Sequence, residues 1–323
     1  VPTGQAGPIF VVSQAAIAQQ ADQATLGTLA GVLARHSPRI YTIKSASATL
    51  QPDSVDTDPT VFWLHDLQTH HGLDLDLSHL SDLPGLIARF AGNVSGFVAY
   101  DPATRSTNAA LIRCAASDGV ISAGTPAMAA HLRSLGIPMV ANLSASTPEA
   151  EFALSKPKLS RRGMVSQPDD GSKSQCLSDW AVFARLPTLE HDPSKHGGRD
   201  GPGFTAVLEN FDQSRLSAAY GWTTDEHQFT AAVTAAGGMV HASDFAYNMP
   251  LLSNLPPFQA PPTPAPPTPP ARWGKKHTVA FVMSDGDNLQ ILQNDWMSTR
   301  HWSHPQRGSV PTSWSCERKH YPR

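Results

Sequence analysis

The fold is decided by residues 96–143, GFVAYDPATRSTNAALIRCAASDGVISAGTPAMAAHLRSLGIPMVANL, where short apolar runs alternate with helical patterns. The strand-like runs are residues 96–100, 119–123 and 137–143. The second helical stretch opens with Thr125 as a predicted N-cap and with Pro126 in its first turn. Continuously apolar strands that alternate with helices are typical of a parallel sheet covered on both faces. We therefore predict an α/β fold with a mostly parallel sheet, in which all three strands, including residues 137–143, are buried.

The same alternation extends toward the N-terminus. Residues 13–36 have leucines at helical spacing behind Ser13, which predicts a helix with a serine cap, and residues 39–43 predict a short strand. Residues 61–67, VFWLHDL, fit either a strand or the start of a helix. In residues 82–90 the apolar positions recur at i, i+3, i+4 and i+7, which predicts another helix. We expect residues 1–150 to form one N-terminal layered α/β domain.

The composition changes after residue 150. The stretch SKPKLSRRGMVSQPDDGSKSQ, residues 155–175, is polar and without period, so we predict a variable or disordered linker and insertion over residues 151–203. Strand and helix patterns return from residue 204 to residue 323. The proline tract at 256–270 is typical of an extended spacer inserted between two strands.

Bulk composition excludes several classes of protein. The 323-residue chain is 40% hydrophobic and 16% charged, with a net charge of −3, so it carries no electrostatic footprint for nucleic acid or an anionic membrane. No apolar run approaches the roughly 20 residues of a membrane span. The three cysteines have neither a pairing pattern nor metal spacing, and the sequence contains no HExxH, GxSxG, P-loop or GxGxxG motif.

Carboxylates follow three successive strand patterns in the second half of the chain. Their positions are Asp225 and Glu226 after the first strand, Asp244 with Asn248 after the second, and Asp285 and Asp287 with Asn288 after the third. If the three strands are parallel neighbours, the acidic sets converge on the carboxyl edge, where α/β enzymes place catalytic groups. Simpler roles exist, because Asp225 suits a helix N-cap, Glu226 suits a first helical turn, and Asp244 and Asn248 suit a turn.

The run SDGDN at 284–288 is the strongest of these signals. Two carboxylates and a carboxamide at the end of an apolar strand risk desolvation and mutual repulsion, whereas one capping residue would serve a turn. A polyhydroxylated ligand or a cation would offset that cost. Asp285 and Asp287 are therefore candidate catalytic residues, and they are also candidate ligands for a divalent cation, although the spacing is not that of a calcium loop.

Several segments, in order along the chain, resemble one known family. They are TLAGVLARHSPRIY (28–41), GFVAYDPATRSTNAALIRCAASDGVI (96–121), YGWTTDE (220–226), ASDFAYNMPLLS (242–253), VAFVMSDGDNLQ (279–290) and RGSVPTSW (307–314). The family is that of the "GxGYxYP putative glycoside hydrolases". The resemblance implies an N-terminal α/β domain, a TIM-barrel-like domain over residues 204–323, and hydrolysis of carbohydrate. Apart from the divalent cation for which Asp285 and Asp287 are candidate ligands, we expect no cofactor. It also favours a secreted or extracellular location.

Two departures from the family pattern bear on this expectation. The motif G-x-G-Y-x-Y-P that names the family is absent, and Ala30 and Ala34 replace a glutamine and an asparagine of its first segment. Three or four strands after residue 204 fall short of the eight or so that close a barrel, so we expect an incomplete barrel-like domain.

The leading hypothesis is hydrolysis of a glycosidic bond by two carboxylates. Asp285 or Asp287 would supply one and Glu226, Asp244 or Asp225 the other. Asn288 and Asn248 would bind sugar hydroxyls, and Trp222 would stack on a sugar face. Three alternatives stay open: metal-assisted removal of a substituent from a polysaccharide, a carbohydrate-binding protein without turnover, and a truncated inactive product. Nothing in the sequence specifies the sugar or the linkage.

Overall fold

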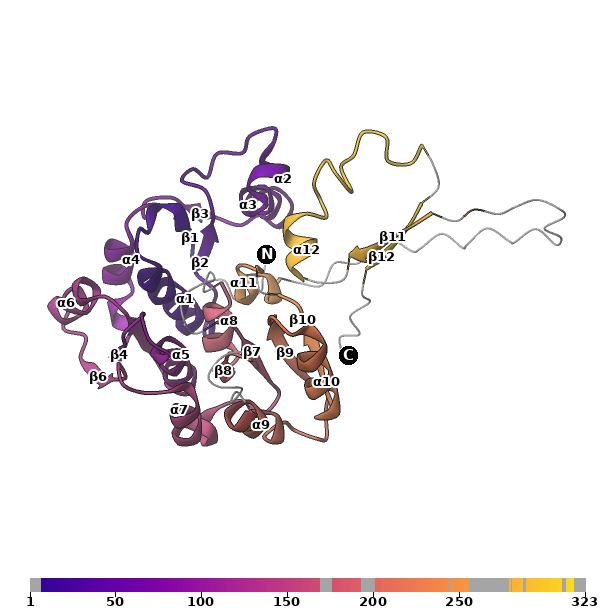
Figure 1. Cartoon of the computed structure of the whole chain (residues 1–323). Coiled ribbons are helices and arrows are strands. Elements are labelled where there is room, and N and C mark those ends of the chain that lie inside the picture. Colours follow the sequence, from indigo (N-terminus) through magenta and orange to yellow (C-terminus); the bar gives the residue numbers. More distant parts are fainter. Residues whose placement is uncertain are drawn as a thin grey trace.

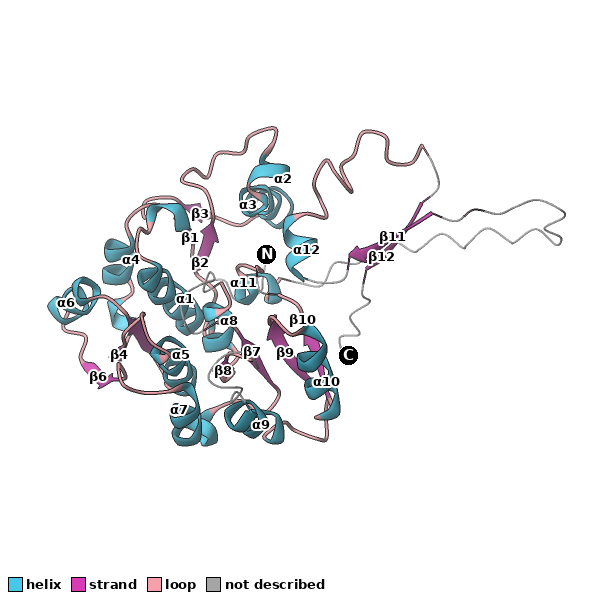
Figure 2. Cartoon of the chain, viewed as in Figure 1, coloured by secondary structure: helices cyan, strands magenta, loops and turns pink. Residues whose placement is uncertain are grey.

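The computed structural model describes residues 7–168, 176–192, 201–243, 245–255, 279, 281–286, 289–309 and 312–316. Of residues 201–202, 281–286, 289–290 and 312–316 it describes only the course of the backbone. The strands of these residues form four separate sheets, and every strand pair is parallel (Figures 1 and 2). The predicted α/β class with mostly parallel strands is therefore confirmed. No described sheet closes into a barrel.

The first sheet has the order β2-β1-β3. Its strands are β1 (Ile9–Ser13), β2 (Ile40–Ile43) and β3 (Leu75–Asp76). All of β1 is buried, yet the sequence patterns indicated only the helix after it. That helix, α1 (Gln20–Ala34), begins later than predicted, because Ser13 is the last residue of β1 and caps the short 3₁₀ helix Gln14–Ala16 through its side chain.

Helices cover this sheet. They are α2 (Ser54–Thr57), α3 (Pro59–His71) and α4 (Leu83–Arg89). The ambiguous VFWLHDL run lies within α3, because the carboxylate of Asp58 accepts a hydrogen bond from the Thr60 N–H and Pro59 occupies the first turn. The apolar side chains of α4 are buried as the i, i+3, i+4 spacing predicted.

The second sheet has the order β5-β4-β6. Its elements are β4 (Gly96–Ala99), α5 (Ser106–Ala116), β5 (Val120–Ala123), α6 (Pro126–Ser134) and β6 (Met139–Asn142). The Thr125 hydroxyl caps α6 by accepting from the Met128 N–H, as predicted. The prediction that residues 137–143 form a buried strand is wrong in one respect: β6 is a strand at the sheet edge, and Met139 and Val140 are 43% and 50% exposed.

The third sheet has the order β10-β9-β7-β8. Its strands are β7 (Gly163–Ser166), β8 (Thr188–Leu189), β9 (Ser217–Gly221) and β10 (Gly238–His241). Its helices are α7 (Pro148–Ser155), α8 (Ser178–Phe183), α9 (Gly201–Glu209) and α10 (Glu226–Ala235). The prediction of an unstructured stretch over 151–203 is therefore wrong where residues are described. The strand β7 is fully buried, because it pairs with a strand on each side, and four residues are too short a run to stand out between polar flanks.

The fourth sheet pairs β11 (Phe281–Gly286) with β12 (Thr312–Cys316), and α12 (Leu289–Asn294) follows β11. As expected, Asp285 and Gly286 are the last two residues of a strand. The expectation that β9, β10 and β11 are neighbours is confirmed only for β9 and β10, since β11 shares no described ladder with either. The described ladders therefore do not place the three strands on one sheet edge, and the meeting of the three acidic sets stays a prediction. The proline tract 256–270 lies outside the described residues.

Helix α8 packs closely on α1, and this contact positions the site described below. A Cβ atom on Gly27 would lie 2.7 Å from the Ser178 side chain, and one on Gly31 would lie 2.6 Å from the Asp179 carbonyl oxygen. The two glycines therefore let the helix backbones approach. No helix in the described part of the chain has both the length and the apolar character to cross a bilayer.

Candidate functional site

Asp225 and Glu226 lie at the start of α10. The Asp225 carboxylate accepts a hydrogen bond of 2.9 Å from the Gln228 N–H, so it caps the helix, which is the simpler role that its position suggested. Glu226 is exposed in the first turn of the same helix, and Trp222 is half-buried just after β9. The structure thus gives Asp225 a structural role, while catalysis by either carboxylate stays a prediction.

Asn248 has a different environment from the one expected of a surface turn. It is 5% exposed, and its φ of 59° lies in the left-handed region that asparagine tolerates. Its Oδ1 accepts from the Thr42 N–H at 2.7 Å, and its Nδ2 donates to the Thr42 carbonyl at 2.9 Å. The carboxamide therefore continues the hydrogen bonding of β2 and fixes the start of α11 (Met249–Ser253) against the first sheet.

The other candidates cannot be placed beside these residues. Asp244, Asp287 and Asn288 lie outside the described residues, and so does the side chain of Asp285. Their proposed roles stay predictions. In sequence, however, Asn288 directly precedes α12, and α12 supplies part of the wall of a cavity.

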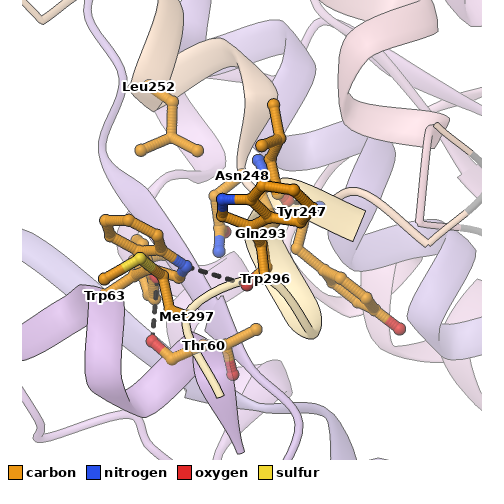
Figure 3. A pocket seen from close by; sticks show the side chains of 10 residues that line it. Thr60, Trp63, Tyr247, Asn248, Leu252, Gln293, Trp296 and Met297 are labelled. Atoms are coloured by element: carbon orange, nitrogen blue, oxygen red, sulfur yellow. Dashed lines mark hydrogen bonds between the residues drawn. The ribbon is translucent and has the colours of Figure 1, made fainter. Parts of the chain in front are cut away.

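This cavity has a volume of about 290 Å³ and lies between α3, α11 and α12 (Figure 3). Figure 1 shows α12 beside α3, although the two helices are more than 200 residues apart in the sequence. The lining residues come from three parts of the chain. They are Tyr41, Thr60 and Trp63 from the first part, Tyr247, Asn248 and Leu252 from the second, and Leu292, Gln293, Trp296 and Met297 from the third.

Hydrogen bonds between these parts hold the wall together. The Trp63 indole donates to the Gln293 carbonyl at 2.8 Å, and the Gln293 side-chain oxygen accepts from the Tyr247 N–H at 2.9 Å. The Asn294 Nδ2 donates to the Phe245 carbonyl at 3.1 Å. The Trp63 ring is therefore held by a polar contact at its edge, and the other two bonds fix the backbone at Phe245 and Tyr247 against α12.

A second, much smaller cavity of about 30 Å³ adjoins the first, because Tyr247 and Asn248 line both. Its lining includes the polar residues Gln14, Gln23 and Asp179. Its volume suits about one water molecule. The Tyr247 hydroxyl reaches Gln14 Oε1 at 3.2 Å, so the tyrosine spans from the aromatic cavity to the polar one.

Asp179 is the most perturbed carboxyl beside these cavities. It is 8% exposed at the start of α8, and its Oδ1 accepts from the Trp180 N–H at 2.6 Å. Burial raises the pKa of Asp179 to about 7, and the N–H groups of Trp180 and of Asp179 itself only partly oppose this. No ion pair involves Asp179 in the described part of the chain, which is why burial dominates. The carboxyl is therefore largely protonated below neutral pH.

Lys44 brings a positive charge to the same region. Its ammonium lies 4.9 Å from the centre of the Tyr247 ring and donates to Asn294 Oδ1. Burial lowers the pKa of Lys44, and the nearby charge of Asp58 opposes the effect. A cation thus lies over the face of Tyr247, and Tyr247 and the buried Asp179 both line the small cavity.

The sequence analysis missed Asp179, Lys44, Trp63 and Tyr247. Asp179 stands in a helical pattern where an acidic residue in the first turn is ordinary, and Trp63 stands in a run that fits either a strand or a helix. Tyr247 stands in the sequence FAYNMP, residues 245–250, in which only Asn248 was selected as a candidate site residue. No group of three or more metal-ligating side chains occurs among the described residues, which do not include the Asp285 and Asp287 side chains.

The fold and the cavity define an α/β protein of parallel sheets with an aromatic site where three segments meet. Family models match the same three segments: "GxGYxYP_N 1st domain" at residues 9–92, "GxGYxYP third domain" at 162–254, and "GxGYxYP putative glycoside hydrolase C-terminal domain" at 275–321. The chain belongs to the GxGYxYP family.

A solved structure supports the fold. The "putative hydrolase" from Bacteroides thetaiotaomicron VPI-5482 superposes with a TM-score of 0.75 at 17% sequence identity. The match covers 97% of the present chain and 58% of the Bacteroides chain, so the present chain spans little more than half of that protein. No curated protein matches the chain.

Proposed function

We propose that this protein is a carbohydrate-active hydrolase of the glycoside hydrolase type, with its reaction site beside the aromatic cavity. The observation that carries the proposal is the position of the cavity. Its wall comes from all three segments that match the family, and a buried carboxyl, Asp179, lies in the adjoining chamber. The name of the family, and the description of the Bacteroides protein as a hydrolase, agree with this reaction class.

Asp179 has the properties of a general acid. Hydrolysis of a glycoside needs a carboxylic acid that is still protonated near neutral pH, so that it can donate a proton to the leaving oxygen. A pKa raised to about 7 provides this. Proton donation by such a group contributes roughly 10²–10⁴-fold to the rate.

The second carboxylate would come from the SDGD run. Asp285 and Asp287 precede α12, whose Leu292 and Gln293 line the cavity, so only a few residues separate them from its wall. In the proposal one of them stays ionised and acts as nucleophile or base, and the segment around β11 belongs to a TIM-barrel-like domain. A separation of about 5 Å from the acid would give retention, and one of roughly 6.5–9.5 Å would give inversion.

The test is to incubate the full 323-residue chain with a panel of polysaccharides and glycosides and to measure the reducing sugar that is released. For any substrate that is cleaved, we expect Asp179→Asn to lower kcat at least about 100-fold. Asp53→Asn is the matched control, because Asp53 is exposed and makes no capping bond, and it should leave kcat unchanged. We also expect activity to fall as the pH rises through about 7, where Asp179 loses its proton.

Two results would count against the proposal. If the folded chain cleaves none of the substrates, the reaction class is wrong. If Asp179→Asn and Asp53→Asn have the same kcat as the unaltered chain, the class stands but Asp179 is not the acid. Assays with and without a chelator separate the metal-assisted alternative, in which the SDGD carboxylates would bind a divalent cation.

A further inference from the structure

Several polar groups in the wall of the aromatic cavity are already engaged within the protein. The Trp63 indole donates to the Gln293 carbonyl at 2.8 Å, and the Tyr41 hydroxyl donates to the Thr60 carbonyl at 2.9 Å. Both polar atoms of the Asn248 carboxamide bond to the backbone of β2. A pyranose carries a hydroxyl on most of its ring carbons, and each hydroxyl needs a partner when it is buried. The wall of this cavity is therefore poorly suited to enclosing a sugar ring.

The remaining wall is apolar and large enough for a specific kind of group. Trp63 and Met297 lie on one side with Leu252 above them, and Trp296 and Tyr247 lie across from them (Figure 3). The volume of about 290 Å³ is nearly twice that of the cavity of roughly 150 Å³ known to bind benzene. A group of two fused aromatic rings, or an alkyl chain of similar volume, fits this space.

The polar chamber is next to this apolar one. Tyr247 and Asn248 form part of both walls, and the far side of Tyr247 faces the Lys44 ammonium and Gln14. Lys44 and Gln14 therefore contact Tyr247, which is part of the wall of the aromatic cavity. The polar chamber has room for about one water molecule, so the aromatic cavity is the one of the two that can hold an apolar group of a ligand.

We infer that the site takes an amphipathic glycoside whose apolar aglycone, aromatic or alkyl, occupies the aromatic cavity, while the sugar stays outside that cavity. The assignment of the sugar rests on the proposed function. The assignment of the aromatic cavity to an apolar group rests on its wall alone, and the two can therefore be tested separately.

The first measurement is calorimetric titration of the full chain with 2-naphthol, a two-ring probe, and with methyl β-D-glucopyranoside as a polar probe. From typical ligand efficiencies we expect a Kd on the order of 0.1 mM for 2-naphthol and no measurable binding of the methyl glucoside in the same range. Leu252→Trp should fill the cavity and weaken 2-naphthol binding at least tenfold. Leu216→Trp adds the same ring at a position that is 61% exposed, and it should leave the Kd unchanged.

A second variant guards against misfolding of Leu252→Trp. Leu252→Ala enlarges the cavity, so it should raise the affinity for the three-ring 9-phenanthrol relative to that for 2-naphthol. Both affinities are measured on the same protein sample, which makes their ratio independent of small losses of folded protein. An unchanged ratio would mean that the probes bind elsewhere.

The outcomes separate this inference from the proposed function. Absence of 2-naphthol binding, or equal binding by Leu252→Trp and Leu216→Trp, overturns the apolar assignment even if the chain cleaves glycosides. Binding that only Leu252→Trp abolishes supports the assignment even if no substrate is cleaved. If a glycoside is cleaved, 2-naphthol should inhibit competitively; non-competitive inhibition would place the aglycone outside the cavity.

Discussion

Replacing Asp179 by asparagine should change the pH dependence of stability in a direction that is unusual for an aspartate. The Asp179 pKa is about 7 in the folded chain and about 3.8 in the unfolded chain, so the folded state holds a proton over the range in between. Where the folded state binds more protons, the free energy of unfolding falls as pH rises. The stabilisation that comes from the protonated Asp179 is fully present below about pH 4 and is lost as the pH rises through about 7.

The magnitude follows from the size of the shift. Each pH unit in this window changes the free energy of unfolding by 1.36 kcal/mol for one proton. Between pH 5 and pH 8 the unfolded state is deprotonated while the folded state loses its proton only around pH 7, so the free energy of unfolding of the native chain falls by about 3 kcal/mol. Asparagine has nearly the same shape, can still accept from the Trp180 N–H, and does not titrate. The free energy of unfolding of Asp179→Asn, relative to that of the native chain, should therefore rise by about 3 kcal/mol between pH 5 and pH 8.

The assay is urea unfolding at pH 5, 6, 7 and 8, followed by circular dichroism, on the native chain, on Asp179→Asn and on the exposed control Asp53→Asn. Taking the difference between each variant and the native chain cancels the titration of all other groups. The difference for Asp179→Asn should grow with pH, while that for Asp53→Asn should stay flat. A difference for Asp179→Asn that does not vary with pH would refute the claim that the buried carboxyl is protonated near neutrality, and with it the proposed role as acid.

Three further substitutions probe the scaffold by urea unfolding. Gly163→Ala would bring a Cβ atom to 2.2 Å from a carbonyl oxygen of β9 and should cost more than about 3 kcal/mol, whereas Gly92→Ala has no atom within 4 Å and should change stability by less than about 1 kcal/mol. Thr125→Ala should cost about 1 kcal/mol through loss of the α6 cap, and serine at that position should restore it. Arg113→Met leaves the 2% exposed Glu151 carboxylate without its ion pair, which should cost about 3–5 kcal/mol, and adding Glu151→Gln should recover most of this loss; no recovery would mean that the arginine acts through packing.

The parts of the fold that could be predicted are those encoded by neighbouring residues. The cap at Thr125, the spacing in α4 and the alternation from residue 96 onward are local signals, and the structure confirms the elements they predicted. The burial of β6 could not be predicted in this way. Its sequence, IPMVANL, is as apolar as that of a central strand, and only its position at the edge of the sheet exposes Met139 and Val140.

The candidate site depended even more on distant residues. The sequence analysis selected carboxylates at strand ends, and of these the structure shows Asp225 capping a helix. Asp179 was not selected, because its raised pKa arises from burial by α1 and by the segments around the small cavity, and no local pattern reports burial of that kind. Composition around a carboxylate indicates where a strand ends, whereas its pKa depends on what the rest of the chain packs against it.

The aromatic cavity exists only while α12 and the residues after it stay docked on the rest of the protein. The hydrogen bonds that hold this segment include those from Lys44 to Asn294, from Trp63 and Tyr247 to Gln293, from Asn294 to Phe245, and from Thr299 to Asp56. Each such bond contributes about 1 kcal/mol net, so docking depends on several of them together and on the apolar side chains around the cavity. A ligand in the cavity touches all three segments and binds only when they are assembled. Ligand binding and docking of the segment are therefore thermodynamically linked. The free energy by which the ligand stabilises the docked arrangement equals the free energy by which docking strengthens ligand binding. An apolar occupant would therefore do more than fill a site: it would complete the packing between α3, α11 and α12.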